Sequence, residues 1–497
     1  MTFFELHRLR AACGGQFLQR PAGAVTVEGI GIDTRQPLDG KAYVAIRGER
    51  YDGHAFLADA VRCGARLLVV DQELSRGQMD EELPEDVAVI QVDDTRQALG
   101  RLASAYRRTW TMTRVIAVTG SCGKTTTKEM IHHVLGTSFR GRAAPRSFNN
   151  DIGVPLTLLS VQPGDQYVVL EVGTSSSGEI GRLSAIAEPD IAVITMIGRA
   201  HLEHFGTVEA IAKEKAALVA HLDHQGLAIV TADAPELRAY LRLADAIVLF
   251  GESDDADLRL TGRGRDAEGW WLTVNGRQTF RLGLPGSHNA QNALAAIAVA
   301  RRFGLRDEKI SRQLSAVQAP AMRLSRSVAG EVVYFNDAYN ANPESMRACL
   351  AAFEEVASAS EAEGRRIIVL GDMLELGPAA EGLHRELAVD LDSMRQRRAV
   401  DEVVLVGPLA GLIADELAGR WPAESIRTVA HLTDRVAAEM VADFSPGDVV
   451  LLKASRGMEL ERLIDAVGDR SSTPAETTGS SPEPSAGMAD TSGHQHA

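Results

Sequence analysis

The stretch VTGSCGKTTTKEM, residues 118–130, has the composition and spacing of a phosphate-binding loop. It reads G-x-x-G-K-T-T, which is shorter than the common G-x-x-x-x-G-K-[ST] form. Backbone N–H groups at a helix start can bind phosphates, a lysine can neutralise them, and a threonine hydroxyl can reach Mg²⁺. The alternative is a glycine-rich turn between a strand and a helix. The candidate nucleotide-binding residues here are Thr119, Gly120, Ser121, Cys122, Gly123, Lys124, Thr125 and Thr126.

Two side chains that could hold a metal ion follow this loop. Glu171 lies at the end of the apolar run QYVVLEVG, and His201 follows the run DIAVITMIG by a few residues. Functional groups of a parallel sheet gather at the carboxyl edge of its strands. Either residue alone could equally be a solvated strand end or a satisfied histidine. Together, after a phosphate loop, they favour a metal-nucleotide site.

The segment TVEAIAKEKAALVAHL after His201 has the apolar stripe of a helix and carries Lys213 and Lys215. The two lysines are two positions apart, so they point in different directions on a helix. Lysines on such a helix usually face solvent. The pattern alone therefore favours two surface lysines.

These residues require sheets that bring strand ends together, and the rest of the sequence supplies them. Residues 111–318 alternate apolar runs with helical segments, which predicts β-α-β units on a parallel sheet. Residues 319–467 repeat this style with VVYFND, RRIIVLGDM, DEVVLVG and DVVLLKASRG. Residues 1–110 hold shorter runs such as AYVAI and ARLLVV. We therefore predict three α/β domains, and a disordered tail at 468–497, which is rich in Ser, Thr, Pro and Gly.

Composition narrows the class of protein. A chain of 497 residues is long enough for about three domains, and 45% hydrophobic residues can build a core in each. A net charge of -15 argues against a general nucleic-acid binder. The four scattered cysteines favour a reduced, cytoplasmic protein. We expect no signal peptide and no membrane span.

Eight blocks in a fixed order resemble the motifs of one family. They are TGSCGKTT, NNDIGVPLTLL, EVGTSSSGEIGRL, GRAHLEHFG…AKEK, LPGSHNAQNALAA, FNDAYNANPESM, VLGDMLELG and LLKASRGMELE, over residues 119–461. The earlier segment DTRQPLDGKAYVAIRGERYDGHAF looks like the same family's uridine-nucleotide domain. The chain resembles the Mur ligases, ATP-dependent enzymes that build peptidoglycan precursors.

The resemblance implies a division of labour among the domains. It implies a UDP-sugar-binding domain (1–110), an ATP-binding domain (111–318) and a Rossmann-like domain (319–467) that brings the incoming amino compound. The block NDAYNANPESM is most like that of members that add D-alanyl-D-alanine to UDP-N-acetylmuramoyl-tripeptide through an acyl phosphate. Another amide-forming ligase, such as a folylpolyglutamate synthetase-like enzyme, and a catalytically inactive homologue are the alternatives. The segment before the phosphate loop disfavours the former, and intact Lys124, Glu171, His201 and Lys215 disfavour the latter.

The resemblance also implies roles for single residues. Lys124 would neutralise charge on the transferring phosphoryl group. Thr125, Glu171 and His201 would hold magnesium, of which the resemblance implies two ions. Lys215 would be carbamylated and help to hold the second ion. Four further residues would meet the nucleotide, although helix capping or a plain surface position is the alternative for most of them. They are Asn289, Asn292, Arg323 and Asp337.

Assignments at the substrate end are less specific, because turns and polar loops explain the same residue types. Lys453, Ser455 and Arg456 could hold phosphate or a substrate carboxylate, and Asp372 could serve the incoming amine or only cap a helix. We expect a monomer whose third domain closes about a hinge near SAVQAPAMR. The predicted substrate-binding residues are Thr34, Arg35, Asn149, Asn150, Thr174, Ser175, Asn340 and Asn342.

Overall fold

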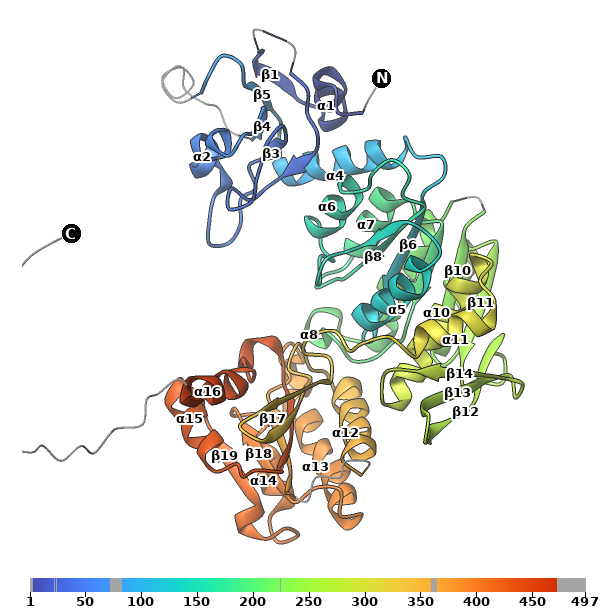
Figure 1. Cartoon of the computed structure of the whole chain (residues 1–497), viewed down its shortest axis with the longest axis vertical. Coiled ribbons are helices and arrows are strands. Elements are labelled where there is room, and N and C mark those ends of the chain that lie inside the picture. Colours follow the sequence, from blue (N-terminus) through green and yellow to red (C-terminus); the bar gives the residue numbers. More distant parts are fainter. Residues whose placement is uncertain are drawn as a thin grey trace, which may run out of the picture.

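The computed structural model of the chain contains three α/β domains, each built on its own sheet. The N-terminal and C-terminal domains lie at the two ends of the central domain (Figure 1). Most of the predicted tail, residues 472–497, lies outside the described residues. The structure describes residues 3–21, 23, 25–71, 83–223, 225–358 and 364–471.

The N-terminal domain has a five-stranded sheet in the order β1-β5-β4-β3-β2. Only β1 runs antiparallel to its neighbour. The runs AYVAI and ARLLVV form β3 and β4, as predicted. The elements are α1 (Leu6–Cys13), β1 (Gln16–Gln19), β2 (Ile30–Gly31), β3 (Ala42–Val44), α2 (Leu57–Arg62), β4 (Leu67–Val70), β5 (Ala88–Gln91) and α4 (Thr95–Arg107).

The central domain is built on a nine-stranded sheet in the order β14-β13-β12-β11-β10-β9-β6-β8-β7. Its parallel part confirms the predicted β-α-β arrangement. Its strands are β6 (Arg114–Thr119), β7 (Gly141–Ala143), β8 (Tyr167–Glu171), β9 (Ile191–Ile194), β10 (Leu227–Thr231), β11 (Ala246–Gly251), β12 (Leu258–Asp266), β13 (Gly269–Val274) and β14 (Gln278–Leu282). Its helices are α5 (Lys124–Gly136), α6 (Gly153–Leu159), α7 (Glu179–Ala187), α8 (Leu202–Phe205), α9 (Val208–Ala216), α10 (Ser287–Arg302) and α11 (Asp307–Leu314).

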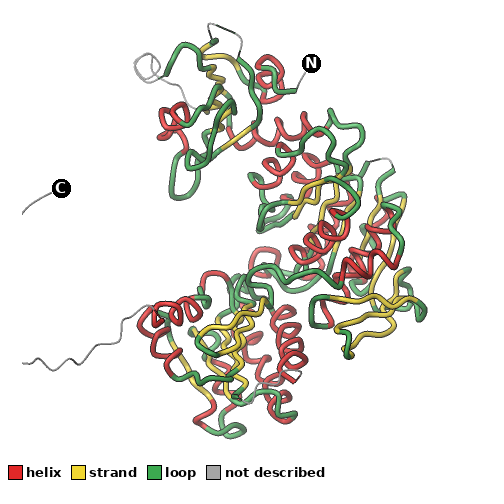
Figure 2. The backbone as a smooth tube through the Cα atoms, in the orientation of Figure 1, coloured by secondary structure: helices red, strands yellow, loops and turns green. Residues whose placement is uncertain are grey.

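Burial on both faces explains why β6 is a continuous apolar run. Val115 and Ala117 join the core that also contains α4, α6 and α7, whereas Ile116 and Val118 join the core with α5 and α10. Parallel sheets covered by helices on both sides have this pattern. Helices lie on both sides of the strands in the tube view (Figure 2). The functional edge of the sheet is therefore held by two hydrophobic cores.

The far end of the central sheet differs from the sequence-based expectation of a parallel sheet. The strands β12, β13 and β14 pair antiparallel and extend the sheet beyond β11. Along β12, the buried or half-buried Leu258, Leu260, Gly262 and Gly264 alternate with exposed polar residues, as in a strand with one solvated face. The strands predicted from the sequence were all continuous apolar runs, so this alternating pattern was not recognised as a strand.

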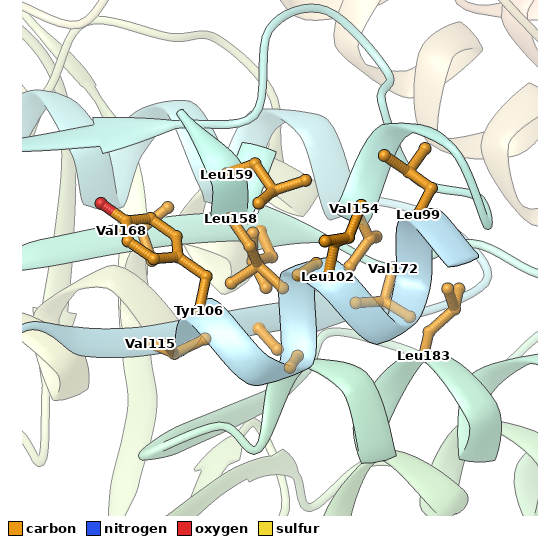
Figure 3. Packing of buried hydrophobic residues seen from close by; sticks show 14 of the residues in the cluster. Leu99, Leu102, Tyr106, Val115, Val154, Leu158, Leu159, Val168, Val172 and Leu183 are labelled. Carbon is orange, nitrogen blue, oxygen red and sulfur yellow. The ribbon is translucent and has the colours of Figure 1, made fainter. Parts of the chain in front are cut away.

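Helix α4 connects the N-terminal domain to the central one. Leu99 and Leu102 lie in the same hydrophobic cluster as Val154 and Leu158 of α6 (Figure 3). The Tyr106 hydroxyl donates a 2.8 Å hydrogen bond to the carbonyl of Val161. Because this core crosses the domain boundary, the first domain is firmly seated on the second.

The C-terminal domain has a six-stranded sheet in the order β15-β16-β20-β17-β18-β19, with only β15 antiparallel. The four predicted apolar runs form β16, β17, β18 and β20. The strands are β15 (Ser325–Ala329), β16 (Val332–Asn336), β17 (Arg366–Gly371), β18 (Glu402–Val406), β19 (Ile426–Val429) and β20 (Val449–Lys453). The helices are α12 (Pro343–Ser358), α13 (Ala380–Gln396), α14 (Leu412–Leu417), α15 (Asp434–Ala442) and α16 (Arg462–Ser471).

Among the described residues, no helix is both long enough and apolar enough to cross a membrane.

Candidate active site

The phosphate loop joins the end of β6 to the start of α5, as its sequence predicts. Gly120 and Gly123 both have positive φ, at 153° and 83°. A Cβ on Gly120 would lie 1.9 Å from the Thr195 hydroxyl, and one on Gly123 would lie 2.3 Å from the side-chain oxygen of Asn292. Both positions therefore require glycine, and the loop is packed against the end of β9 and the first turns of α10.

Lys124 is the first residue of α5 and is half-buried. Its Nζ donates a 2.8 Å hydrogen bond to the carbonyl of Gly120. Burial lowers the pKa of Lys124, while the nearby Glu171 carboxylate opposes that shift. The lysine thus folds back over the loop, in the position from which it can meet an anion bound at the helix start.

Glu171 ends β8 and is only 1% exposed. Its Oε1 accepts a 3.1 Å hydrogen bond from Asn149 Nδ2, but its Oε2 has no hydrogen-bond partner among the described residues. A buried carboxylate oxygen in this state is costly unless a cation or a donor joins it. The described residues contain no group of three or more His, Cys, Asp or Glu side chains arranged for a metal. Mg²⁺ beside phosphates needs only one or two protein ligands, so the single orphaned oxygen fits that ion.

His201 lies at the start of α8 with a left-handed backbone, φ 57°. Its Nδ1 contacts Oε2 of Glu375, which belongs to the C-terminal domain. Burial lowers the pKa of His201, and the Glu375 carboxylate opposes that shift. One ring nitrogen is therefore used between domains, which leaves Nε2 as the possible metal ligand.

The two lysines of α9 lie in opposite environments. Lys213 is exposed, whereas Lys215 is 2% exposed. Burial, with a further contribution from the charge of Lys124, lowers the pKa of Lys215 to about 7. Within the described residues, the Lys215 amino group has no hydrogen bond or ion pair. The surface position favoured by the pattern is correct for Lys213 and wrong for Lys215.

The first turns of α10 hold two buried asparagines beside the phosphate loop. Asn289 Nδ2 donates to the carbonyl of Pro285 at 2.6 Å, and Asn292 Nδ2 donates to Asn289 Oδ1 at 3.2 Å. Neither contact is an N-terminal cap to the helix backbone. The pair instead forms a polar link that holds Asn292 close to Gly123.

Residues of the C-terminal domain reach this loop. A guanidinium nitrogen of Arg323 lies 3.5 Å from the Thr125 hydroxyl, and its carbon lies 4.2 Å from the centre of the Tyr339 ring. Asn342 contacts the sulfur of Cys122 and also accepts a 2.9 Å hydrogen bond from the backbone of Ser345. Asn342 therefore both caps α12 and contacts the phosphate loop.

Several predicted residues have partners inside their own domain. Asp337 forms a 2.9 Å ion pair with Lys453, whose Nζ also donates to the carbonyl of Asn340 at 2.5 Å. Asp372 accepts hydrogen bonds from the backbone N–H groups of Leu409 and Ala410. These two donors lie in the turn before α14 and not at the start of α13, the helix that follows Asp372 in the chain.

Two further predicted residues from this group also have local partners. Ser455 Oγ accepts a 2.9 Å hydrogen bond from the Leu374 backbone, and Arg456 pairs with Glu461.

The candidate substrate-binding residues fall into two groups. Asn149, Asn150, Thr174 and Ser175 line a cavity of about 1500 Å³. The Asn150 side chain also accepts a 2.9 Å hydrogen bond from the backbone N–H of Gly153 and so caps the start of α6. Thr34 and Arg35 are not among the lining residues of this cavity, and Arg35 is an exposed residue paired with Asp33 at 2.8 Å. The structure therefore brings the central-domain residues together and leaves Thr34 and Arg35 apart from them.

Two adjoining cavities collect most of these side chains. A cavity of about 1500 Å³ is lined by residues of all three domains, and one of about 130 Å³ lies over the phosphate loop. The larger includes Glu49, Asp94, Arg96, Lys124, Asn149, Asn150, Glu171, Thr174, Ser175, Arg182, His201, Arg323, Asn340, Asn342, Glu375 and Arg456. The smaller includes Ser121, Cys122, Gly123, Lys124, Thr125, Thr126, Asn289, Asn292, Arg323, Asp337, Asn340, Asn342 and Lys453.

Sequence reasoning missed some residues that the structure brings to the site. Arg199 donates a 2.8 Å hydrogen bond to Glu344 across the domain boundary. Neither residue was predicted, although Glu344 follows Asn342 by two positions. Glu214 accepts hydrogen bonds from the backbone at the start of α7. Lys128 is completely buried behind Glu171. Only Lys128 carried a signal, since it follows Lys124 by one helical turn.

Three family models match the chain, one for each domain. Residues 26–107 match the Mur ligase family catalytic domain, residues 118–300 the Mur ligase middle domain, and residues 322–456 the Mur ligase glutamate ligase domain. The chain is 37% identical to the UDP-N-acetylmuramoyl-tripeptide--D-alanyl-D-alanine ligase of Bacillus subtilis, over 88% of this chain and 92% of that one. It is 31% identical to the ligase of the same name from Escherichia coli, over 89% and 94%.

Solved structures agree with the sequence matches. A crystal structure of MurF from Acinetobacter baumannii has a TM-score of 0.80 and 30% identity, and the match covers 94% of this chain and 99% of that one. The MurF ligase from Thermotoga maritima, solved in complex with ADP, has a TM-score of 0.74 and 26% identity, covering 89% and 99%.

Proposed function

The chain belongs to the Mur ligase family, and we propose that it joins D-alanyl-D-alanine to UDP-N-acetylmuramoyl-tripeptide in an ATP-dependent, ADP-forming reaction. The reaction is a step of peptidoglycan precursor synthesis. The observation that carries this proposal is the cavity of about 1500 Å³ lined by all three domains. It joins the phosphate loop to a chamber large enough for a nucleotide-linked peptide, and relatives matched along most of their length carry that activity in their names.

ATP binds, in this proposal, with its phosphates on the loop at the start of α5. The backbone N–H groups of residues 120–126 hold the phosphate oxygens, and Lys124 exchanges its internal contact with the Gly120 carbonyl for the β and γ phosphates. Asn292 contacts adenine and Asn289 supports it. Arg323 and Asp337 meet the nucleotide from the C-terminal domain, a role supported by the Arg323 contact with Thr125.

Thr125, Glu171 and His201 hold magnesium in this scheme, through the hydroxyl, the orphaned Oε2 and the free Nε2 respectively. Bound Mg²⁺ would neutralise charge on the phosphate oxygens. The neutral Lys215 amine would react with CO₂, lose a proton and become a carbamate, which would supply an anionic ligand for a second ion. Its burial and its pKa of about 7 support this, because carbamate formation needs the neutral amine.

The peptide carboxylate attacks the γ-phosphate of ATP, forms an acyl phosphate and releases ADP. The amine of D-alanyl-D-alanine then attacks the acyl carbon, and phosphate leaves through a tetrahedral intermediate. The residues contribute mainly by positioning and by neutralising charge. Lys124 stabilises negative charge on the transferring phosphoryl group, and Arg323 adds a second cation when the C-terminal domain closes.

The other substrate contacts follow from the cavity lining. Asn149, Asn150, Thr174 and Ser175 line the channel for the sugar-peptide, and Asn340 and Asn342 help to select the dipeptide. Thr34 and Arg35 bind the uridine nucleotide on the N-terminal domain. We propose that the protein acts as a monomer. We also propose that it acts in the cytoplasm, because ATP and UDP-linked substrates are found in that compartment.

One assay tests the function. Phosphate release from ATP is measured with UDP-N-acetylmuramoyl-tripeptide, with and without D-alanyl-D-alanine. Release that depends on both substrates, with formation of the pentapeptide product, supports the proposal. Release with a folate and glutamate instead would identify a folylpolyglutamate synthetase-like enzyme, and no release with any pair would identify an inactive homologue.

A further inference from the structure

A second lysine is buried one helical turn after Lys124. The Lys128 side chain is 0% exposed, and its Nζ donates hydrogen bonds to the carbonyls of Ala144 at 2.8 Å and Arg146 at 2.6 Å. It lines neither cavity. An ammonium group removed from water is costly unless it is paired, so its retention here requires a compensating arrangement.

Two carboxylates complete that arrangement. Lys128 Nζ lies 3.1 Å from Oε1 of Glu129 and 3.8 Å from Oε2 of Glu171. The Glu171 oxygen is the one without a hydrogen-bond partner among the described residues. The ammonium is therefore close enough to attract this oxygen, yet too far away to occupy it with a hydrogen bond.

The two carbonyls that accept from Lys128 belong to the loop between β7 and α6. Arg146 in this loop has a left-handed backbone, φ 49°, which is unfavourable for a residue with a Cβ. Three residues later, Asn149 donates the 3.1 Å hydrogen bond to Oε1 of Glu171. Lys128 thus attracts Oε2 of Glu171 directly by its charge. It acts on Oε1 indirectly, because it anchors the loop that carries Asn149.

We propose that Lys128 is a positioning residue that fixes the Glu171 carboxylate, with Oε2 free to face a metal-nucleotide complex. This inference rests on the proposed function, in which Glu171 holds Mg²⁺. Lys128 touches neither substrate nor ion. It acts by holding the 144–149 loop and by restraining rotation of the Glu171 side chain, so that the metal ligand is preorganised.

The test is Mn²⁺ binding to the full chain in the presence of ADP, followed by electron paramagnetic resonance of the free ion. Lys128→Met, which keeps the side-chain length without charge or donors, should weaken Mn²⁺ binding at least tenfold. Lys128→Gln, which keeps one amide donor group, should weaken it by a similar or smaller factor. Glu129→Gln is the matched control and should stay within twofold, because that carboxylate is partly exposed and screened by solvent.

A double-mutant cycle separates positioning from general stability. In a Glu171→Gln background, adding Lys128→Met should change Mn²⁺ binding less than twofold, because the group on which Lys128 acts has already been altered. The KM values for the UDP-tripeptide and the dipeptide should also stay within twofold while kcat falls. Far-ultraviolet circular dichroism identifies folded variants, and if Lys128→Met does not fold, Lys128→Gln provides the comparison.

A folded Lys128 variant that binds Mn²⁺ as tightly as the natural chain, or more tightly, would overturn the inference. An equal loss in the Glu171→Gln background would also overturn it. The proposed function fails differently: the natural chain itself would then bind no Mn²⁺ with ADP.

Discussion

Lys215 of the central domain and Lys453 of the C-terminal domain are buried equally but paired very differently. Their side chains are 2% and 1% exposed. Lys453 forms an ion pair with Asp337 and donates to two backbone carbonyls. Lys215 has no such partner among the described residues, and its pKa falls to about 7.

A similar contrast separates one carboxylate at the edge of the central sheet from one at the edge of the C-terminal sheet. Glu171 at the edge of the central sheet keeps one oxygen without a hydrogen-bond partner, whereas Asp372 at the edge of the C-terminal sheet accepts two backbone hydrogen bonds. Unsatisfied buried groups are costly and tend to occur where a ligand completes them. At these two sheet edges, the central domain therefore keeps a buried carboxylate oxygen without a hydrogen bond, whereas the Asp372 carboxylate of the C-terminal domain accepts its hydrogen bonds from nearby backbone.

The largest effect is expected at the phosphate loop. Lys124→Ala should lower kcat by about a thousandfold or more, because it removes the cation closest to the transferring phosphoryl group. The measurement is ADP release in a coupled assay, with an unchanged melting temperature to show that the fold is intact. Turnover within tenfold of the natural chain would contradict the assignment of ATP to this loop.

The unpaired lysine should come next. Lys215→Ala should lower kcat about a hundredfold, because it removes the proposed carbamate ligand. Lys213→Ala is the matched control from the same helix and should change kcat less than twofold, since Lys213 is exposed. Short-chain carboxylates added to Lys215→Ala should restore part of the activity by replacing the missing anion.

Formation of the proposed carbamate should depend on pH in a defined direction. Burial lowers the pKa of Lys215 to about 7, so the neutral amine that reacts with CO₂ increases as the pH rises through about 7. A carbon-13 carbamate signal from labelled CO₂ should grow over that range and be absent from Lys215→Ala. A signal that persists in Lys215→Ala, or a dead Lys213→Ala with an active Lys215→Ala, would contradict the choice of lysine.

The paired lysine should affect stability. Lys453→Met leaves the Asp337 carboxylate without its partner, and breaking a buried pair in this way costs about 3–5 kcal/mol. Unfolding of the C-terminal domain in urea can be followed by the fluorescence of Trp421, which is buried in that domain, after the other tryptophans are replaced by phenylalanine. The free energy of unfolding is obtained from this curve. Lys213→Met should cost less than about 0.5 kcal/mol. Equal costs for the two changes would mean that the ion pair of Lys453 contributes no more to stability than an exposed lysine does.

Much of the fold around the candidate site could be predicted from residue patterns, because strands and phosphate loops have local signatures. The runs that form β6, β8 and β9, and the loop before Lys124, were identified from apolar stretches and glycine spacing. Burial of a particular lysine depends instead on distant elements that pack over it. Helical periodicity alone favoured solvent for Lys215, and only the resemblance to Mur ligases identified it as a candidate site residue.

Contacts between domains were the least predictable. The contact of His201 with Glu375 joins residues 174 positions apart, and that of Arg199 with Glu344 joins residues 145 positions apart. Neither pair lies within a single local motif. The antiparallel strands β12–β14 were missed for a different reason, since the charged, glycine-containing sequence of β12 resembles a polar loop.

The smallest effect is expected where the two contrasted domains meet. Arg199→Ala removes a half-buried ion pair with Glu344, worth about 1 kcal/mol, which corresponds to about a fivefold change in the population of the closed arrangement. The expected result is a fivefold lower kcat/KM for ATP with little change in melting temperature. Because the Arg199 backbone also donates to Glu344 at 2.9 Å, the contact is weakened rather than lost. The charge-swapped variant Arg199→Glu with Glu344→Arg should recover part of the loss, and a swap no better than Arg199→Glu alone would mean that this pair does not hold the domains together.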